Sequence, residues 1–168
     1  MPATYEKIAS TTLGSAAATI DFTSISSAYT DLRLVLVCTT SVSNVLRLRY
    51  NADSATNYSC TDLIGDGFSG ASYRKTNISS VELTESATVG TSTTIPQLFA
   101  VDIFSYAGST YKTCLLLTGE EYSGGGQVQA KVGLWRSTSA INQITLSLSG
   151  AANFNTGSTA TIYGILKA

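Results

Sequence analysis

The stretch Val128-Gln129-Ala130-Lys131-Val132-Gly133-Leu134-Trp135 places an apolar residue at every second position. The same period of two returns in Ile144–Leu148 and in residues 160–166, where the alternate positions are mostly Ser and Thr. Such a period predicts strands with one face turned to a core and the other to solvent. We therefore expect the apolar positions from Val128 to Leu134 to be buried. The positions expected to face solvent carry little charge, which favours a role in packing or surface display over a catalytic role.

Similar short stretches recur along the whole chain, separated by runs of small polar residues. The strands that they predict are 4–9, 17–22, 31–39, 45–51, 57–64, 78–84, 97–105, 111–118, 128–136, 141–149 and 159–167. The loops that they leave are 51–57, 65–72, 85–94, 119–127 and 150–158, with Gly124-Gly125-Gly126 as a flexible tip. Helical signal is nearly absent. The pattern indicates an all-β protein, and we expect an antiparallel β-sandwich, jelly-roll-like, with residues 1–168 in a single domain.

The composition narrows the classes of function. A chain of 168 residues is large enough for one self-sufficient core. Charged residues make up 12%, about half the usual share, and the net charge of −1 argues against a nucleic-acid partner, which needs clustered Lys and Arg. No apolar stretch approaches the ~20 residues that span a bilayer, so we expect no membrane partner. The N-terminal residues lack the apolar core of a signal peptide, which predicts a protein made in the cytosol.

The three cysteines, Cys38, Cys60 and Cys114, form an odd set without paired spacing. Two of them stand inside apolar runs, LVLVC and TCLLL, where a free cysteine behaves as a small hydrophobe. We expect all three to be reduced structural thiols.

The candidate partner-contact residues are Arg33, Arg47 and Arg49. Their placement depends on a predicted hairpin in which Leu32–Cys38 pairs with Leu46–Tyr50, with Leu side chains on one face and the three arginines on the other. Two arginines on one strand face are usually solvated, and the alternative is that they meet carboxylates or the sheet edge of a partner.

The sequence contains few residues that could act in catalysis. Histidine is absent, which removes the commonest general base and metal ligand. Glu120 and Glu121 are adjacent, so on a strand they would point to opposite sides, which does not suit an acid/base pair. We expect that the protein is not an enzyme and needs no cofactor.

Two binding alternatives stay open. Oxygen ligands for calcium are available at Asn51, Asp53, Asp62 and Asp66, although their spacing matches no EF-hand and Asp66-Gly67 is more simply a turn. A sugar-stacking platform could draw on the aromatic residues Tyr122, Phe68, Tyr73, Phe154 and Trp135. For Trp135, a core or interface position fits its well-patterned strand better.

Turn and strand consensus, with no active-site signature, appears in these stretches: 8–15 (IASTTLGS), 20–25 (IDFTSI), 29–34 (YTDLRL), 46–51 (LRLRYN), 57–59 (NYS), 106–112 (YAGSTYK), 133–142 (GLWRSTSAIN) and 157–165 (GSTATIYGI). Together they resemble a family of small all-β virion proteins of tailed bacteriophages, over nearly the whole chain and in the same order. One departure is Ala52, which stands where the pattern has Gly.

The resemblance implies a structural protein of the virion, assembled in the host cytoplasm. The first hypothesis is a capsid decoration (cement) protein that binds the major capsid protein on the outer head lattice as a homotrimer, with a jelly-roll-like fold. The second is a tail-tip or fibre domain that recognises a host surface glycan. An enzyme acting on cell-wall polysaccharide is disfavoured because histidine is missing and the carboxylates are poorly placed.

Overall fold

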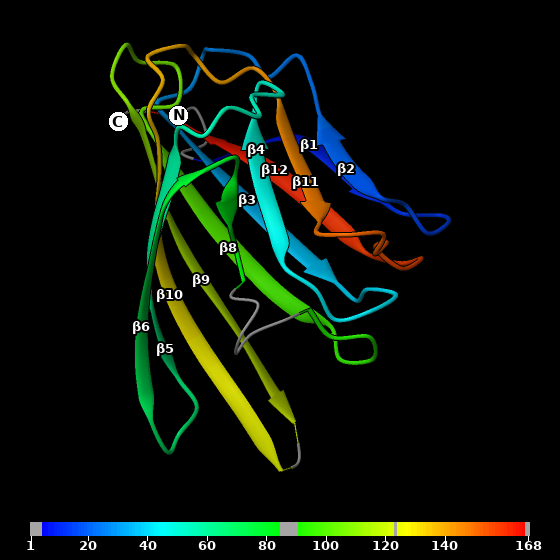
Figure 1. Ribbon diagram of the computed structural model, residues 1–168. Coiled ribbons are helices and arrows are strands. Elements are labelled where there is room, and N and C mark those ends of the chain that lie inside the picture. Colours follow the sequence, from blue (N-terminus) through cyan, green and yellow to red (C-terminus); the bar gives the residue numbers. More distant parts are fainter. Residues whose placement is uncertain (1–4, 85–90, 123, 167–168) are drawn as a thin grey trace.

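The computed structural model describes residues 5–84, 91–122 and 124–166, which fold into two antiparallel β-sheets (Figure 1). The large sheet has the order β1-β12-β3-β8-β9-β10-β5-β6 and the small sheet has the order β2-β11-β4-β7. The strands are β1 (Tyr5–Thr12), β2 (Thr19–Phe22), β3 (Asp31–Cys38), β4 (Leu46–Tyr50), β5 (Tyr58–Gly65), β6 (Gly70–Ile78), β7 (Val81–Glu82), β8 (Gln97–Phe104), β9 (Lys112–Tyr122), β10 (Gly125–Trp135), β11 (Ile144–Leu148) and β12 (Thr159–Ile165).

The core lies between the two sheets and follows from the alternation of each strand. Leu32, Leu34 and Leu36 of β3 are fully buried, as are Leu46 and Leu48 of β4. Large side chains of the neighbouring strands complete the core, among them Phe22, Tyr50, Phe99, Val101, Ile103, Ile144, Leu146 and Ile162. Because inward residues alternate with outward ones, each sheet presents one face to the core and one to the outside. The prediction of an antiparallel β-sandwich is confirmed; the strand order does not confirm the jelly-roll arrangement.

The two sheets differ in length, and this difference shapes the molecule. The small sheet lies over β12, β3 and the upper parts of the other strands, with β7 against β5 and β10, whereas β9, β10, β5 and β6 continue beyond it toward the bottom of Figure 1. The part of the large sheet that extends past the small sheet carries the β9–β10 and β5–β6 hairpins.

Most strand predictions are confirmed, and two elements differ. The predicted strands each overlap an observed strand, but β6 has no counterpart, because Gly70–Ile78 is polar and lies at the sheet edge with most side chains exposed. The predicted loop 119–127 is wrong over most of its length, since its residues extend β9 and β10 into a longer hairpin. In the predicted loop 85–94, residues 85–90 lie outside the described residues.

The predicted hairpin of Leu32–Cys38 with Leu46–Tyr50 is also wrong. β3 belongs to the large sheet and pairs with β12 and β8, while β4 belongs to the small sheet and pairs with β11 and β7. The two leucine faces do meet, but across the core rather than side by side. The apolar pattern of the two strands fits either arrangement. Strands that pair in one sheet and strands that pack face to face across a core show the same alternation of apolar and polar residues.

The buried face of β10 is the reverse of the prediction. Gln129, Lys131 and Trp135 point inward and are 1%, 1% and 2% exposed, whereas Val128 and Val132 are 66% and 52% exposed. The expectation for β11 and β12 is confirmed, with Ile144, Leu146 and Ile162 fully buried in the hydrophobic core between the sheets. In β10 the polar residues Gln129 and Lys131 are inside because both contact the Asp62 carboxylate there.

Candidate functional site

A block of apolar side chains covers the outer face of the large sheet over five neighbouring strands. One row across the strands is formed by Val35, Ala100, Leu117, Ala130 and Leu63. The rows on either side add Val37, Leu98, Val128, Leu115 and Val132. We call these ten residues the outer apolar face. A shallow hollow of ≈ 350 Å³ lies at its β5–β6 end, lined by Leu63, Ile64, Gly65, Gly70, Val128 and Ala130.

The exposure of this face is high for its composition. Leu63 is 63% exposed, Leu117 54% and Leu98 51%. Gly119 sits between Leu98 and Val128, and a Cβ there would lie 2.9 Å from the carbonyl oxygen of Gln127, so the backbones leave no room for a side chain. The result is a flat, apolar surface.

Behind the part of the outer apolar face that lies on β5 and β10, the inner side of these two strands carries polar residues. Asp62 of β5 and Lys131 of β10 are direct partners across the two strands, with Nζ 3.6 Å from Oδ2 and both side chains buried. Gln129 Nε2 donates to the same Asp62 oxygen at 2.6 Å. A buried charge needs such partners, and here they are supplied only when β5 and β10 pair. The pair is closed to solvent, so its role is structural.

The two adjacent glutamates lie on opposite sides of β9, as the sequence predicts. Glu120 is on the inner side, where its carboxylate accepts hydrogen bonds from Gln97 Nε2 at 2.6 Å and Gln127 Nε2 at 2.7 Å. Glu121 is exposed and lines an outer hollow. They therefore cannot act on one glycosidic bond as a pair.

The three arginines do not share a face. Arg33 projects from the outer face of the large sheet, where its Nε lies 3.6 Å from Asp102 Oδ1. Arg47 and Arg49 project from the outer face of the small sheet, where Arg47 lies 4.0 Å from Glu82 and Arg49 Nε donates to the Ser79 carbonyl at 3.2 Å. The sandwich thus separates Arg33 from the other two. Their role in partner contact stays a prediction.

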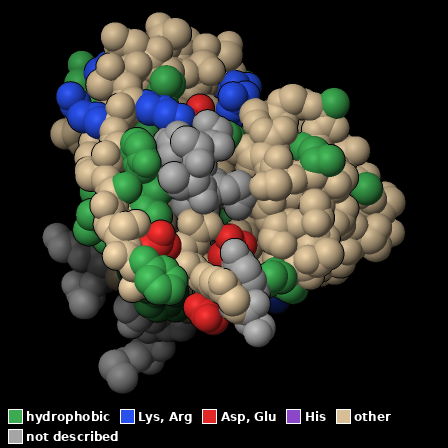
Figure 2. All heavy atoms as spheres, turned by 60° about the horizontal axis from the view of Figure 1, so that its bottom comes forward, with side chains coloured by type: hydrophobic (Ala, Val, Ile, Leu, Met, Phe, Trp, Pro, Cys, Tyr) green, Lys and Arg blue, Asp and Glu red, His purple; other side chains and the backbone are tan. Residues whose placement is uncertain are grey.

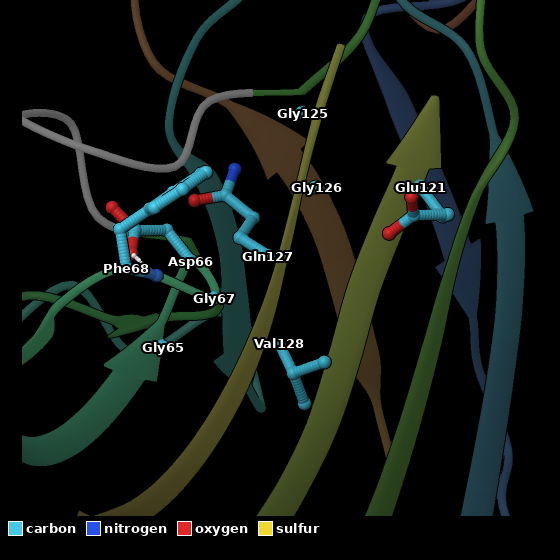
Figure 3. Close-up of a pocket in the computed structure, with 9 residues that line it drawn as sticks. All are labelled: Gly65, Asp66, Gly67, Phe68, Glu121, Gly125, Gly126, Gln127 and Val128. Atoms are coloured by element: carbon cyan, nitrogen blue, oxygen red, sulfur yellow. Dashed lines mark hydrogen bonds between the residues drawn. The ribbon is translucent and has the colours of Figure 1, made fainter. Parts of the chain in front are cut away.

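An open hollow of ≈ 400 Å³ lies between the tips of the β5–β6 and β9–β10 hairpins. Figure 3 shows Asp66, Phe68 and Gln127 on one side of β10 and Glu121 on β9 beyond it. Phe68 is 98% exposed. Asp66 is committed to the turn, since Oδ1 accepts from the backbone N–H of Phe68 at 2.9 Å and of Ser69 at 2.6 Å. These hydrogen bonds, first that of Ser69, hold the pKa of Asp66 below its usual value.

Figure 2 looks at the molecule from the side that carries these hairpin tips. Hydrophobic side chains reach the surface next to acidic ones near the centre of this view, while Lys and Arg side chains gather along its upper side. This end of the molecule therefore combines apolar and acidic groups.

The candidate calcium ligands are dispersed. Asn51 and Asp53 precede β5 and Asp66 follows it, so roughly 25 Å of strand separates them. Asn51 Oδ1 accepts from the backbone N–H of Asn142 at 2.9 Å, and Asp53 Oδ2 accepts from Trp135 Nε1 at 2.7 Å. Among the residues that the structure describes, no group of three or more His, Cys, Asp or Glu side chains could hold a metal ion.

The cysteines are free and buried, as the sequence predicts. Burial raises the pKa of Cys38 to about 12 and that of Cys114 to about 11. Thiols with such pKa values are almost fully protonated at neutral pH and react slowly. They are part of the core, and no redox chemistry follows from them.

The outer apolar face was not found from the sequence, although a signal for it exists. Leu115, Leu116 and Leu117 are consecutive in β9, so both faces of that strand are apolar. A strand that needs cover on both faces has a core on one side and a partner on the other. Phe68, between Gly67 and Ser69, offers no comparable signal.

Comparisons with protein-family descriptions, with curated proteins and with solved structures give no match for this chain. Within the described part of the chain, no helix has the length and apolar character to span a membrane.

Proposed function

We propose that this chain is a virion structural protein of a tailed bacteriophage, a capsid decoration (cement) protein that binds the outer head lattice as a trimer and stabilises it. The observation that carries the proposal is the outer apolar face, a flat and uncharged surface of the kind that permanent protein–protein interfaces bury. The resemblance of the sequence to small phage virion proteins supports the same assignment.

The charged groups of the chain support an assembly role in a second way. The buried ones serve the fold: Asp62 pairs with Lys131, and Lys112 Nζ donates to the Gly108 carbonyl at 2.7 Å. Two outer sheet faces are then available for contact, one apolar and one carrying Arg47 and Arg49. We assign the arginine-bearing face of the small sheet to the major capsid protein, whose carboxylates would match the arginine fork.

A cement protein acts by mass action. Because it binds the intact lattice and not its separated subunits, its binding free energy opposes expansion and rupture of the head. A trimer that engages several capsid subunits at once gains further from effective concentration, so each single contact can be weak.

The test is the purified virion. Quantitative mass spectrometry should count hundreds of copies for each particle, and heads that lack the protein should release their DNA at a lower temperature than complete heads. A handful of copies, or heads of unchanged heat stability, would refute the cement role.

A second candidate, a tail-tip or fibre domain that recognises a glycan, is favoured by one observation. Phe68 presents its whole ring beside a hollow that also holds Glu121 and Gln127, and an aromatic face with carboxylate and amide groups is a suitable surface for sugar hydroxyls and C–H groups. Glycan-array binding that is lost in Phe68→Ala but kept in Tyr111→Ala, which truncates another exposed aromatic ring, would support this function. An array without any bound glycan would speak against it.

A further inference from the structure

The outer apolar face leaves large apolar side chains together in contact with water. Leu63, Leu98, Leu117, Val128 and Val132 are each more than half exposed. Five strands at a spacing of about 4.8 Å span about 19 Å, and the four steps along β10 from Val128 to Val132 span about 13 Å, so the projected area is on the order of 250 Å². Monomeric proteins rarely leave a contiguous apolar patch of more than a few hundred Å² in contact with water.

The charge on this face excludes several kinds of partner. The row that contains Leu115 and Val132 ends in Asp102 and Arg33. These two residues are cross-strand neighbours, with Arg33 Nε 3.6 Å from Asp102 Oδ1, and their charges neutralise each other. The remaining positions of the face are Val, Leu, Ala and Gly119, and the exposed charged residues Arg74 and Glu121 lie at its border. A strongly charged partner would lose hydration here and gain no opposite charge, so the matching surface is flat, apolar and neutral.

We propose that a second copy of this chain covers the outer apolar face, with the same face of each copy turned toward their shared symmetry axis. A flat apolar face is complementary to itself, so symmetry supplies the partner without any second specialised surface. Small residues between the large ones, Ala100, Gly119 and Ala130, leave space for the leucines of the opposite copy.

The edges of the large sheet are less suited to joining two copies. β6, one edge, carries exposed Arg74, and the other edge strand, β1, has a register shift between Lys7 and Ala9. Charged edge residues and bulges both oppose strand addition. Association through the face is therefore favoured over extension of the sheet.

The expected affinity follows from the size of the contact. Two projected faces amount to roughly 500 Å², below the ~1,200 Å² at which stable specific interfaces begin, so association should be weak and should depend on concentration in about the micromolar range. That copies of the chain meet through the outer apolar face is inferred from the exposure and composition of that face. Only the number of subunits, three, rests on the proposed function.

The experiment compares two valines of equal exposure in the full chain. Val132 lies on the outer apolar face and Val42 in a loop, and each is 52% exposed. Size exclusion with light scattering, run up to about 100 µM, should give a mass above the 17.6 kDa chain mass for wild type and for Val42→Glu. Val132→Glu should elute at the chain mass with an unchanged circular dichroism spectrum. A monomeric wild type at the highest concentration, or a folded Val132→Glu of wild-type mass, would overturn the proposal.

A mixing experiment tests whether the same face of two copies meets. Leu117→Glu and Leu117→Lys should each be folded and monomeric, because Leu117 is 54% exposed at the centre of the face. An equal mixture should associate again, since opposite charges then lie across the interface. A mixture that stays monomeric overturns the arrangement of like faces. If wild type is monomeric and Val132→Glu instead loses binding to purified heads, the face belongs to the capsid contact and self-association is refuted. Copy number in the virion tests the cement role separately.

Discussion

Ala52 is one of five non-glycine residues with positive φ in the described part of the chain, and the only one of them without a polar side chain. It follows Asn51 in the turn after β4, and both have positive φ, 51° for Asn51 and 54° for Ala52. Asn tolerates this left-handed conformation better than residues with an apolar Cβ, and glycine tolerates it best.

Ala52→Gly should therefore stabilise the protein. The left-handed conformation costs alanine about 1 kcal/mol relative to glycine, and the greater freedom of glycine in the unfolded chain offsets part of the gain. We expect a rise in the free energy of unfolding of about 0.5 kcal/mol in urea titrations. Ala55→Gly, in the same loop but without positive φ, is the control and should be neutral or destabilising. A destabilised Ala52→Gly would contradict the strain.

Asp53 holds the same loop against β10. Oδ2 accepts from Trp135 Nε1 at 2.7 Å and from Asn57 Nδ2 at 2.8 Å, and Oδ1 accepts from the Ala55 backbone N–H at 2.9 Å. Burial by itself raises the pKa of Asp53, but the hydrogen bonds from Asn57, Ala55 and Trp135 outweigh it, so the pKa lies below its usual value. The ionised carboxylate is thus the form that the fold favours.

The consequence is a loss of stability in acid. Because the folded-state pKa is depressed, the contribution of Asp53 is complete above the unfolded value of about 3.9 and disappears as the pH falls through the folded pKa. Asp53→Asn should lower the free energy of unfolding by about 1–2 kcal/mol near neutral pH and by less near pH 3. Fluorescence of Trp135, the single tryptophan, reports the unfolding directly. An equal loss at both pH values would refute the role of ionisation. Asp21→Asn, on the exposed face of β2, is the matched control.

At the scale of elements, β10 shows how a pairing decides which face is inside. Its inner polar residues, Gln129 and Lys131, are acceptable in the interior because Asp62 of β5 lies opposite Lys131. Lys131 Nζ has no hydrogen-bond partner, so the ion pair is its main compensation. The outward valines of the same strand then become part of the outer apolar face.

Removing one member of this pair should cost more than removing both. Lys131→Met leaves the Asp62 carboxylate buried without an opposite charge and with the Gln129 amide as its hydrogen-bond donor, which should lower the free energy of unfolding by about 3 kcal/mol. The double variant Lys131→Met, Asp62→Leu should regain most of this loss, since an apolar pair of similar volume needs no desolvated charge. Urea unfolding of both variants gives the comparison. A double variant less stable than the single one would contradict this account.

β4 carries the arginines that we assign to the capsid. Replacing Arg47 and Arg49 with Ala should leave the fold intact and change the free energy of unfolding by no more than about 1 kcal/mol, because exposed charge pairs contribute little. The same change should reduce capsid occupancy and lower the temperature at which heads release DNA. Lys7→Ala is the control, since Lys7 is an exposed cation on β1, the edge strand of the large sheet, and lies outside both proposed contact faces. Wild-type occupancy in the double variant would mean that these arginines are only solvated.

The whole molecule presents two outer faces that differ in chemistry. The large sheet is apolar outside, and the small sheet carries the charged groups Arg47, Arg49 and Glu82. In a trimer on a lattice, the first face would join the copies and the second would meet the capsid. This arrangement unites the proposed function with the inferred interface.

The mass of the purified protein tests the trimer. Light scattering coupled to size exclusion should report three times the 17.6 kDa chain mass at concentrations above the dissociation constant. A symmetric closed assembly is expected because faces that are apolar and exposed are unfavourable in a free chain. A mass of twice the chain mass would keep the shared face but refute the trimer.

The sequence by itself determined the strands and most of the core. A period of two in β11 and β12 is enough to identify Leu146 and Ile162 as buried, because the outward positions of these strands are mostly polar. The buried thiols and the opposite sides of Glu120 and Glu121 follow from the same local rule. No long-range information is needed where only one face of a strand is apolar.

The tertiary structure alone decided which face of β10 is inside and which arginines share a side. Alternation gives a strand two faces but does not say which of them meets the second sheet. For β10 the answer depends on Asp62, 69 positions away in the sequence, and for Arg33 on β3 and β4 joining different sheets. Such choices are made by pairing and packing between distant segments, because the energy of a buried charge or of an exposed leucine depends on neighbours that the local pattern does not contain.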